Sequence, residues 1–188
     1  MRFIHPTAII YGNVDIEDDV EIGAYCVIGG PPEHRDFYNG EQSYGVRIGT
    51  GSRIFPFVTI DAGTKEQTII GKDTAIFNHS HIGHDCVLGD SVTIGGDVSL
   101  AGHTTVLDHA TISGKSCTFQ RVVIGHHAFI GGMSFITKNV GIAERWIGFP
   151  PKFVGYNEIG LSRANLTLEE CLKIYGPRFE NALKARCP

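Results

Sequence analysis

Isoleucine recurs at every sixth position near the start of the chain, and this period limits the possible folds more than any other feature. The repeated residues are Ile4, Ile10, Ile16, Ile22 and Ile28. The position two residues before each of the last four holds a small or branched side chain. Neither the helical period of about 3.6 residues nor the strand period of about 2 produces this spacing. A period of six is typical of hexapeptide repeats, which wind into a parallel β-helix.

The array continues along most of the chain with two interruptions. The first is the polar, proline-containing stretch 29–45, which we expect to leave the helix as a loop insertion. The array resumes at Ile48, slips again over 61–68, and then runs without a slip from Ile70 to Ile142, with Thr118 as the one position that is not aliphatic. We therefore expect an all-β domain over residues 1–157, a left-handed parallel β-helix in which three hexads form a coil of about 18 residues.

The remaining segment, 158–188, has a helical pattern and is expected to form a short C-terminal cap on the last coil. Thr167 is a suitable N-cap because Glu170 follows it three residues later, as in a capping box. Gly176–Pro177 is expected to break the helix, leaving a second short helix from Phe179 to Ala185.

Composition excludes several classes of protein. The 188 residues are 42% hydrophobic and carry a formal net charge of −4, which gives no basic surplus for binding nucleic acid. No stretch reaches the roughly 20 apolar residues of a transmembrane helix. The five cysteines form no CxxC pair, so we expect free thiols and a cytoplasmic location.

Titratable side chains are concentrated between His79 and Cys86. His84 lies two residues beyond Ile82, so its side chain is expected on the outer surface, where replacing it costs little stability. Positions 18 apart stack in adjacent coils, which predicts a column of His84, His103 and Gln120 along one side of the prism. Histidine is the natural general base near neutral pH. His109, His126 and His127 are interpreted as ordinary surface residues.

Two other interpretations remain open from the residues alone. A zinc site of the γ-carbonic anhydrase type could use His79 and His84, but the segment 40–50, where a third ligand is expected, has no histidine. A degenerate paralogue could instead use its β-helix only for assembly. A covalent mechanism has no support, because no serine or cysteine lies in a G-x-S-x-G elbow or a similar one.

Several motifs resemble those of the UDP-N-acetylglucosamine acyltransferase family, over residues 5 to about 163. They are HPTAII at the start, HIGHDC from His81, SLAGH ending at His103, Gln120, IGGMS from Ile130, and GYNEIGLSR ending at Arg163. The resemblance implies transfer of an acyl group from acyl carrier protein to a hydroxyl or amine of a UDP-amino sugar, in the synthesis of lipid A or a surface glycolipid. It makes His84 the general base, Asp85 its acidic neighbour and the Gly102 N–H an oxyanion donor.

The same resemblance assigns further residues and an assembly. The substrate-binding positions are Asp36, His81, His103, Gln120, Asn157 and Arg163, and the acyl groove positions are Phe119, Gly132 and Met133. The family is a homotrimer with sites between subunits, in which the loop around Asp36 closes over the substrate from a neighbouring subunit, and it uses no metal or other cofactor.

The chain departs from the family pattern in its length and in a few residues. It is short at both ends, and the C-terminal cationic residues are reduced to Lys173, Arg178, Lys184 and Arg186. Ala164 stands where a second arginine often follows the position of Arg163. These departures leave a coenzyme A-dependent sugar acetyltransferase as the alternative function.

Overall fold

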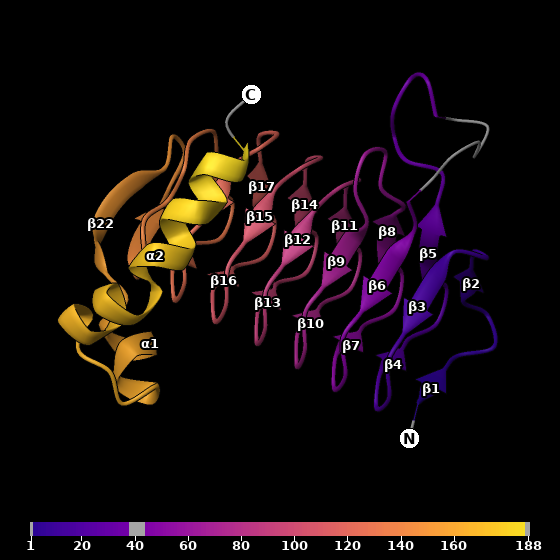
Figure 1. The fold of residues 1–188 in the computed structure, drawn as a ribbon, viewed down its shortest axis with the longest axis horizontal. Helices are drawn as coiled ribbons and strands as arrows, with labels where there is room; N and C mark the ends of the chain where they lie inside the picture. The colour runs from indigo at the N-terminus through magenta and orange to yellow at the C-terminus, as the bar shows by residue number, and fades with distance from the viewer. Residues whose placement is uncertain (1, 38–43, 187–188) are drawn as a thin grey trace.

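The computed structural model describes residues 2–37 and 44–186, which wind into a left-handed parallel β-helix with a helical segment at its C-terminal end (Figure 1). Three sheets, here named A, B and C, form the walls of a triangular prism, and the chain passes through them in the order A, B, C in each coil. Their strands run parallel, except that the last strand of sheet A is antiparallel to its neighbour. The turns that join the sheets form three edges, named A–B, B–C and C–A.

Each wall is a ladder of very short strands. Sheet A contains β1 (Phe3–Ile4), β4 (Glu21–Ile22), β7 (Arg53–Ile54), β10 (Ala75–Ile76), β13 (Thr93–Ile94), β16 (Thr111–Ile112), β19 (Phe129–Ile130), β21 (Glu144–Ile147) and β22 (Lys152–Tyr156). Sheet B contains β2 (Ile9–Ile10), β5 (Val27–Gly30), β8 (Thr59–Asp61), β11 (His81–Ile82), β14 (Ser99–Leu100), β17 (Cys117–Thr118) and β20 (Phe135–Ile136). Sheet C contains β3 (Val14–Ile16), β6 (Val46–Ile48), β9 (Thr68–Ile70), β12 (Val87–Leu88), β15 (Thr105–Val106) and β18 (Val123–Ile124).

The register of the sheets confirms the hexad interpretation. Ile76 pairs with Ile94, and Ile82 pairs with Leu100, so each repeat residue stacks on its equivalent 18 positions later (94 − 76 = 18). The repeat side chains and the small residues two before them form one continuous core, in which Ile76, Ile82 and Val92 are fully enclosed. Each coil buries its apolar surface only against its neighbours, so stability is a sum of adjacent contacts.

The predicted final repeat residue is wrong, because the array slips by two residues after Ile136. Ile124 pairs with Val140 instead of Ile142, and the Gly125 N–H donates to Val140 O (2.9 Å). Ile142 therefore leaves the prism core. It packs instead in a second cluster with Ala143, Leu161 and Cys171, which ties the helical segment to the last coil.

The helical segment differs from the prediction in two respects. A short helix that the sequence did not reveal, α1 (Glu158–Arg163), follows β22 and is capped by the Asn157 side chain. α2 (Leu168–Arg186) then continues through Pro177 without the expected break. Packing of its buried face outweighs the missing proline hydrogen bond, since Cys171, Tyr175 and Phe179 all contact the second cluster. The predicted capping box is confirmed, because Thr167 and Glu170 bond reciprocally.

Two of the three histidines interpreted as surface residues are buried beneath α2. His126 is fully enclosed and stacks on Tyr175 with ring centroids 4.3 Å apart, while His127 stacks on His109, which is exposed. Burial lowers the pKa of His126 and of His127 from 6.5 to about 4, although the nearby Asp108 carboxylate opposes the shift. Both imidazoles are therefore neutral at neutral pH.

This burial predicts a loss of stability in mild acid. Between pH 6.5 and about 4 the unfolded chain binds protons at these histidines and the folded chain does not, so stability falls as pH falls. From pH 7 to pH 5 we expect the free energy of unfolding to drop by about 2 kcal/mol per histidine, as measured by urea titration. His126→Leu should reduce the drop, and His79→Asn, at an exposed histidine, should not. An equal drop in the wild type and His126→Leu would contradict this account.

Candidate active site

His84 lies on the B–C edge, in the turn between β11 and β12, two strands that are labelled in Figure 1. Its side chain points out of the prism as expected, but it is only 6% exposed, so the predicted surface position is wrong. The His103 ring covers it from the next coil with centroids 5.1 Å apart, and the His34 ring covers it at 5.7 Å from the loop after β5. The repeat alone does not show that a loop folds back over this turn.

The Asp85 carboxylate is held by the insertion between β8 and β9, where the hexad array slips over 61–68. Oδ1 accepts the backbone N–H groups of Lys65 (2.8 Å) and Glu66 (2.7 Å), while Oδ2 accepts the N–H (3.0 Å) and hydroxyl (2.7 Å) of Thr64. The fifth contact is His84 Nδ1, 2.7 Å from Oδ2. Burial would raise the pKa of Asp85, but these hydrogen bonds outweigh it and hold the pKa well below its usual value.

An ionised Asp85 sets the tautomer of His84. A carboxylate can only accept hydrogen bonds, so Nδ1 of His84 must carry the proton and donate it to Asp85 Oδ2. In the neutral imidazole, Nε2 is then the nitrogen with the free lone pair. This is the arrangement that a histidine general base needs.

Gly102 lies directly against the His84 ring. A Cβ built on Gly102 would come within 2.6 Å of both Cε1 and Nε2 of His84, so any side chain here would displace the ring. Among the residues that the structure describes, none accepts a hydrogen bond from the Gly102 N–H. The Gly102 backbone therefore lies next to His84 Nε2, where the oxyanion assignment needs a peptide N–H.

A second histidine–carboxylate pair lies beside the first. His81 Nε2 is 3.8 Å from Asp61 Oδ2, and its Nδ1 is 2.8 Å from Thr59 Oγ1. Asp61 is 7% exposed, and burial raises its pKa, although the Glu33 N–H and the charges of His81 and His84 act in the opposite direction. Sequence reasoning missed Asp61 and His34. The two interruptions of the hexad array, at 29–45 and 61–68, were the signal for these residues. Both interruptions fall on the B–C edge in the coils before His84, so their side chains can reach it.

The structure places the other predicted residues on different edges. His103 and Gln120 occupy the B–C edge in the two coils after His84, so the predicted column is present. Asp36 is exposed, two residues beyond His34, in a loop that covers this chain's own His84. Phe119 is also on the B–C edge, whereas Met133 lies on the A–B edge with Gly132, so one chain does not bring the proposed acyl groove residues together.

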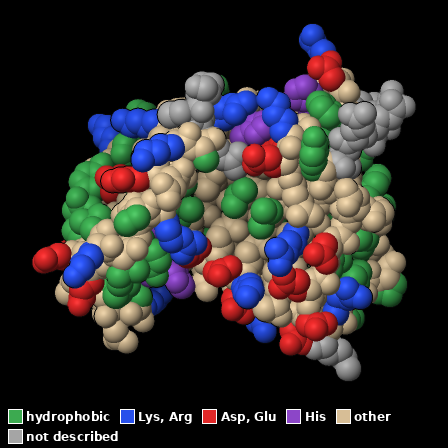
Figure 2. Space-filling model, in the orientation of Figure 1, with side chains coloured by type: hydrophobic (Ala, Val, Ile, Leu, Met, Phe, Trp, Pro, Cys, Tyr) green, Lys and Arg blue, Asp and Glu red, His purple; other side chains and the backbone are tan. Residues whose placement is uncertain are grey.

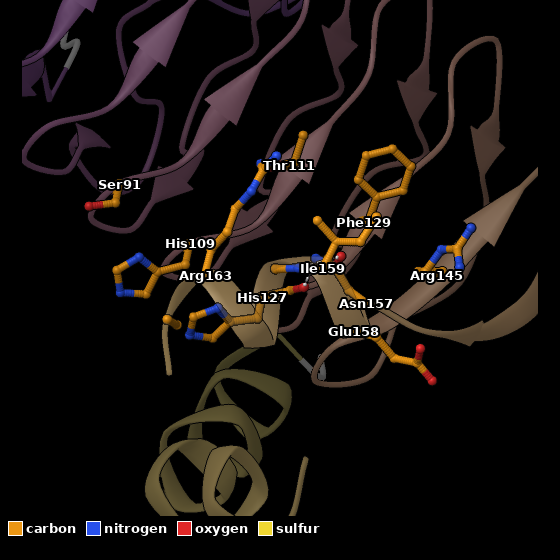
Figure 3. A pocket seen from close by; sticks show the side chains of 12 residues that line it. Ser91, His109, Thr111, His127, Phe129, Arg145, Asn157, Glu158, Ile159 and Arg163 are labelled. Atoms are coloured by element: carbon orange, nitrogen blue, oxygen red, sulfur yellow. Dashed lines mark hydrogen bonds between the residues drawn. The ribbon is translucent and has the colours of Figure 1, made fainter. Parts of the chain in front are cut away.

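Asn157 and Arg163 border a pocket of about 770 Å³ on the C–A edge, away from His84 (Figure 3). The Arg163 side chain extends toward Thr111, and the buried His127 forms part of the wall. Asn157 has a structural role here, since its amide donates to His127 O (2.8 Å) and its Oδ1 accepts the Gly160 N–H (3.1 Å).

His84, Asp85 and His103 are the group of described residues whose ligand atoms lie close enough to hold a metal ion, all within 4.8 Å. Their chemistry does not favour one, because Asp85 already accepts five contacts through its two oxygens. The alternative pair of His79 and His84 is divided between two edges, and His79 stacks on Phe57 at the A–B edge.

Sequence comparison identifies relatives of one kind. The chain is 35% identical over 208 aligned positions to the acyl-(acyl-carrier-protein)–UDP-N-acetylglucosamine O-acyltransferase of Paraburkholderia phymatum, covering 90% of this chain and 79% of that protein. It is 37% identical over 160 residues to the protein of the same name from Bartonella henselae, covering 84% and 58%. The chain belongs to the UDP-N-acetylglucosamine O-acyltransferase family.

Structure comparison agrees with this family assignment. The crystal structure of the UDP-N-acetylglucosamine O-acyltransferase from Moraxella catarrhalis superposes with a TM-score of 0.72 at 30% identity, covering 88% of this chain and 79% of that one. No family model matches the chain. The chain spans 59% of the length of several of the curated UDP-N-acetylglucosamine O-acyltransferases it matches. Of the described helices, none is long and apolar enough to cross a membrane.

The cradle around Asp85 predicts a stability effect that does not depend on activity. Asp85→Ala removes the acceptor of three backbone N–H groups and of the His84 proton, so we expect the free energy of unfolding to fall by roughly 3 kcal/mol. Asp97→Ala is the matched control, because Asp97 occupies the same left-handed turn position (φ 58° against 57°) with an exposed side chain. Urea unfolding of both variants would measure the difference. Equal stability losses would show that the cradle contributes nothing.

Proposed function

We propose that the chain transfers an acyl group from acyl carrier protein to a hydroxyl of UDP-N-acetylglucosamine, with His84 as the general base, in the synthesis of lipid A or a related surface glycolipid. The names of the relatives support the two substrates. The contact between Gly102 and the Nε2 side of a His84 ring oriented by Asp85 is the observation that carries the proposal. No cofactor is required beyond the acyl donor.

The reaction follows from this geometry. His84 Nε2 takes the proton of the sugar hydroxyl while the oxygen forms a bond to the thioester carbonyl carbon. The carbonyl oxygen becomes an oxyanion and accepts the Gly102 N–H. The intermediate then collapses, the carbon–sulfur bond breaks, and the His84 imidazolium returns its proton to the departing sulfur. The products are an ester and a free thiol, and Asp85 stabilises the imidazolium throughout.

A homotrimer would complete the site. The histidine column lies on the B–C edge, and the pocket with Asn157 and Arg163 lies on the C–A edge, so one chain cannot present both groups to one substrate molecule. Two chains packed edge to edge around a threefold axis would bring the B–C edge of one against the C–A edge of the next. In this arrangement the pocket would hold the nucleotide, and Gly132 and Met133 would reach the acyl chain from another subunit.

Charge near the site supports an anionic donor. Figure 2 shows Lys and Arg side chains beside histidines along the B–C edge, where Lys65, Arg121 and Lys138 are exposed. On α2, Lys173 and Lys184 are exposed, whereas Arg178 is bonded to Asp108 (2.6 Å) and is less available to a partner. None of the four described cysteines forms a disulfide, which supports a reducing, cytoplasmic location, and Cys187 lies outside the described residues.

A donor screen tests this function directly. Purified protein is incubated with UDP-N-acetylglucosamine and either acyl carrier protein thioesters of several chain lengths or acetyl-coenzyme A, and the acylated sugar is measured. We expect product with the carrier protein thioesters. Product with acetyl-coenzyme A alone would instead establish the sugar acetyltransferase.

His84→Ala should abolish most of the transfer. Loss of a general base lowers the rate by about 10² to 10⁴, while binding of the nucleotide sugar should persist. Because His84 is buried and donates to Asp85, we expect a stability cost of about 1 to 2 kcal/mol, larger than for a surface change. His79→Asn, at an exposed histidine on the A–B edge, is the control. A folded His84→Ala protein with more than about a tenth of wild-type activity would contradict the acid–base role.

The assembly is tested by mass in solution. Light scattering at micromolar concentration should give three times the 20.5 kDa of one chain. A stable monomer that still transfers acyl groups would show that one chain is sufficient.

A further inference from the structure

Asp61 has a different environment from Asp85, although both carboxylates lie beside a histidine on the B–C edge. Every oxygen of Asp85 has at least two hydrogen-bonding partners. Asp61 accepts a single hydrogen bond within the described residues, from the Glu33 N–H to Oδ2 (3.0 Å), and its Oδ1 has no partner among them. Among the described residues, this oxygen is not one of the enclosed atoms that lack a partner, so a ligand can still supply its donor.

The Asp61 carboxylate lies close to the reacting groups. Its Oδ2 is 3.8 Å from His81 Nε2, and the charge of His84 acts to lower the pKa of Asp61. The side chain remains 9% open, so an approaching molecule can reach it. A carboxylate can accept a hydroxyl hydrogen, and such charge-assisted bonds are stronger and more selective than neutral ones.

Building on the proposed function, we propose that Asp61 determines specificity for the acceptor by binding a sugar hydroxyl that does not react. The Nε2 atom of His81 lies beside Oδ2 of the same carboxylate, and its Nδ1 is paired with Thr59, which fixes the ring. Asp61 and His81 would thus hold the sugar ring while His84 acts on the neighbouring hydroxyl. The contact serves binding and orientation and involves no proton transfer.

A purely structural role is the rival explanation, because the Glu33 N–H ties the loop after β5 to Asp61. Asp61→Asn separates the two. The Asn oxygen can still accept the Glu33 N–H, so the loop anchor remains, while the charge that binds the sugar is lost. Asp97→Asn, at an exposed aspartate on the A–B edge, is the control.

The experiment compares acceptors with and without single hydroxyls. Transfer to UDP-N-acetylglucosamine, and to its 4-deoxy and 6-deoxy analogues, is measured for the wild type, Asp61→Asn and Asp97→Asn. We expect Asp61→Asn to raise the KM for UDP-N-acetylglucosamine by about tenfold to a hundredfold, with the KM for the donor nearly unchanged. For one of the two deoxy analogues, the wild type should show a KM raised by the same factor, because the hydroxyl that Asp61 binds is missing. Asp61→Asn should not raise the KM for that analogue any further.

The outcomes distinguish this inference from the proposed function. An Asp61→Asn enzyme that matches the wild type, or that loses the same factor with all three acceptors, would overturn the role of Asp61 and leave the transferase intact. If the wild type transfers nothing, the proposed function fails.

In that case the role of Asp61 is tested by calorimetry, which measures the affinity of the protein for UDP-N-acetylglucosamine and for UDP. Tighter binding of UDP-N-acetylglucosamine than of UDP, with the difference removed by Asp61→Asn, would support the role of Asp61. Equal affinity of the wild type for both would overturn it.

Discussion

Stacking of inward-facing aliphatic side chains, coil upon coil, is the interaction on which the rest of the structure depends. Ile76, Ile82 and Leu88 are enclosed because equivalent residues lie above and below them in each wall. The strands are only two or three residues long in most coils, so they have no stability of their own. Because the register is fixed by these contacts, the outward residues are also placed at set heights along each edge.

The active-site candidate lies where this regularity is interrupted. Two insertions leave the B–C edge in the coils before His84, one after β5 and one after β8. The second wraps its backbone N–H groups around Asp85, and the first brings His34 over the His84 ring. A bare β-helix turn would leave a histidine and an aspartate in water, where their interaction is weak. The two insertions exclude that water. The hydrogen bond between His84 and Asp85 is therefore short and oriented, and the Asp85 carboxylate stays ionised.

The helical segment and the active-site candidate occupy different edges of the prism, and each has its own buried polar groups. Below α2 the enclosed histidines are neutral, His126 stacks on Tyr175 and His127 stacks on His109, so they contribute packing and a sensitivity to acid. On the B–C edge both oxygens of Asp85 are matched with donors, whereas Asp61 accepts one hydrogen bond within the described residues. The contrast separates histidines that stabilise the fold from those that can act on a substrate.

The sequence by itself determined the parts that repeat. Six-residue spacing predicted the three-walled prism, the 18-residue register and the column of His84, His103 and Gln120, because periodic contacts are local and identical from coil to coil. The family motifs likewise pointed to His84, Asp85 and Gly102, which the structure brings into contact and whose roles stay a prediction. Tertiary structure alone decided what depends on where an irregular segment folds. It showed that His84 is buried, that the slip over 61–68 cradles Asp85, that Val140 replaces Ile142 in the wall, and that α2 passes through Pro177. These features arise from contacts between segments with no common period, and spacing along the chain carries no information about such contacts.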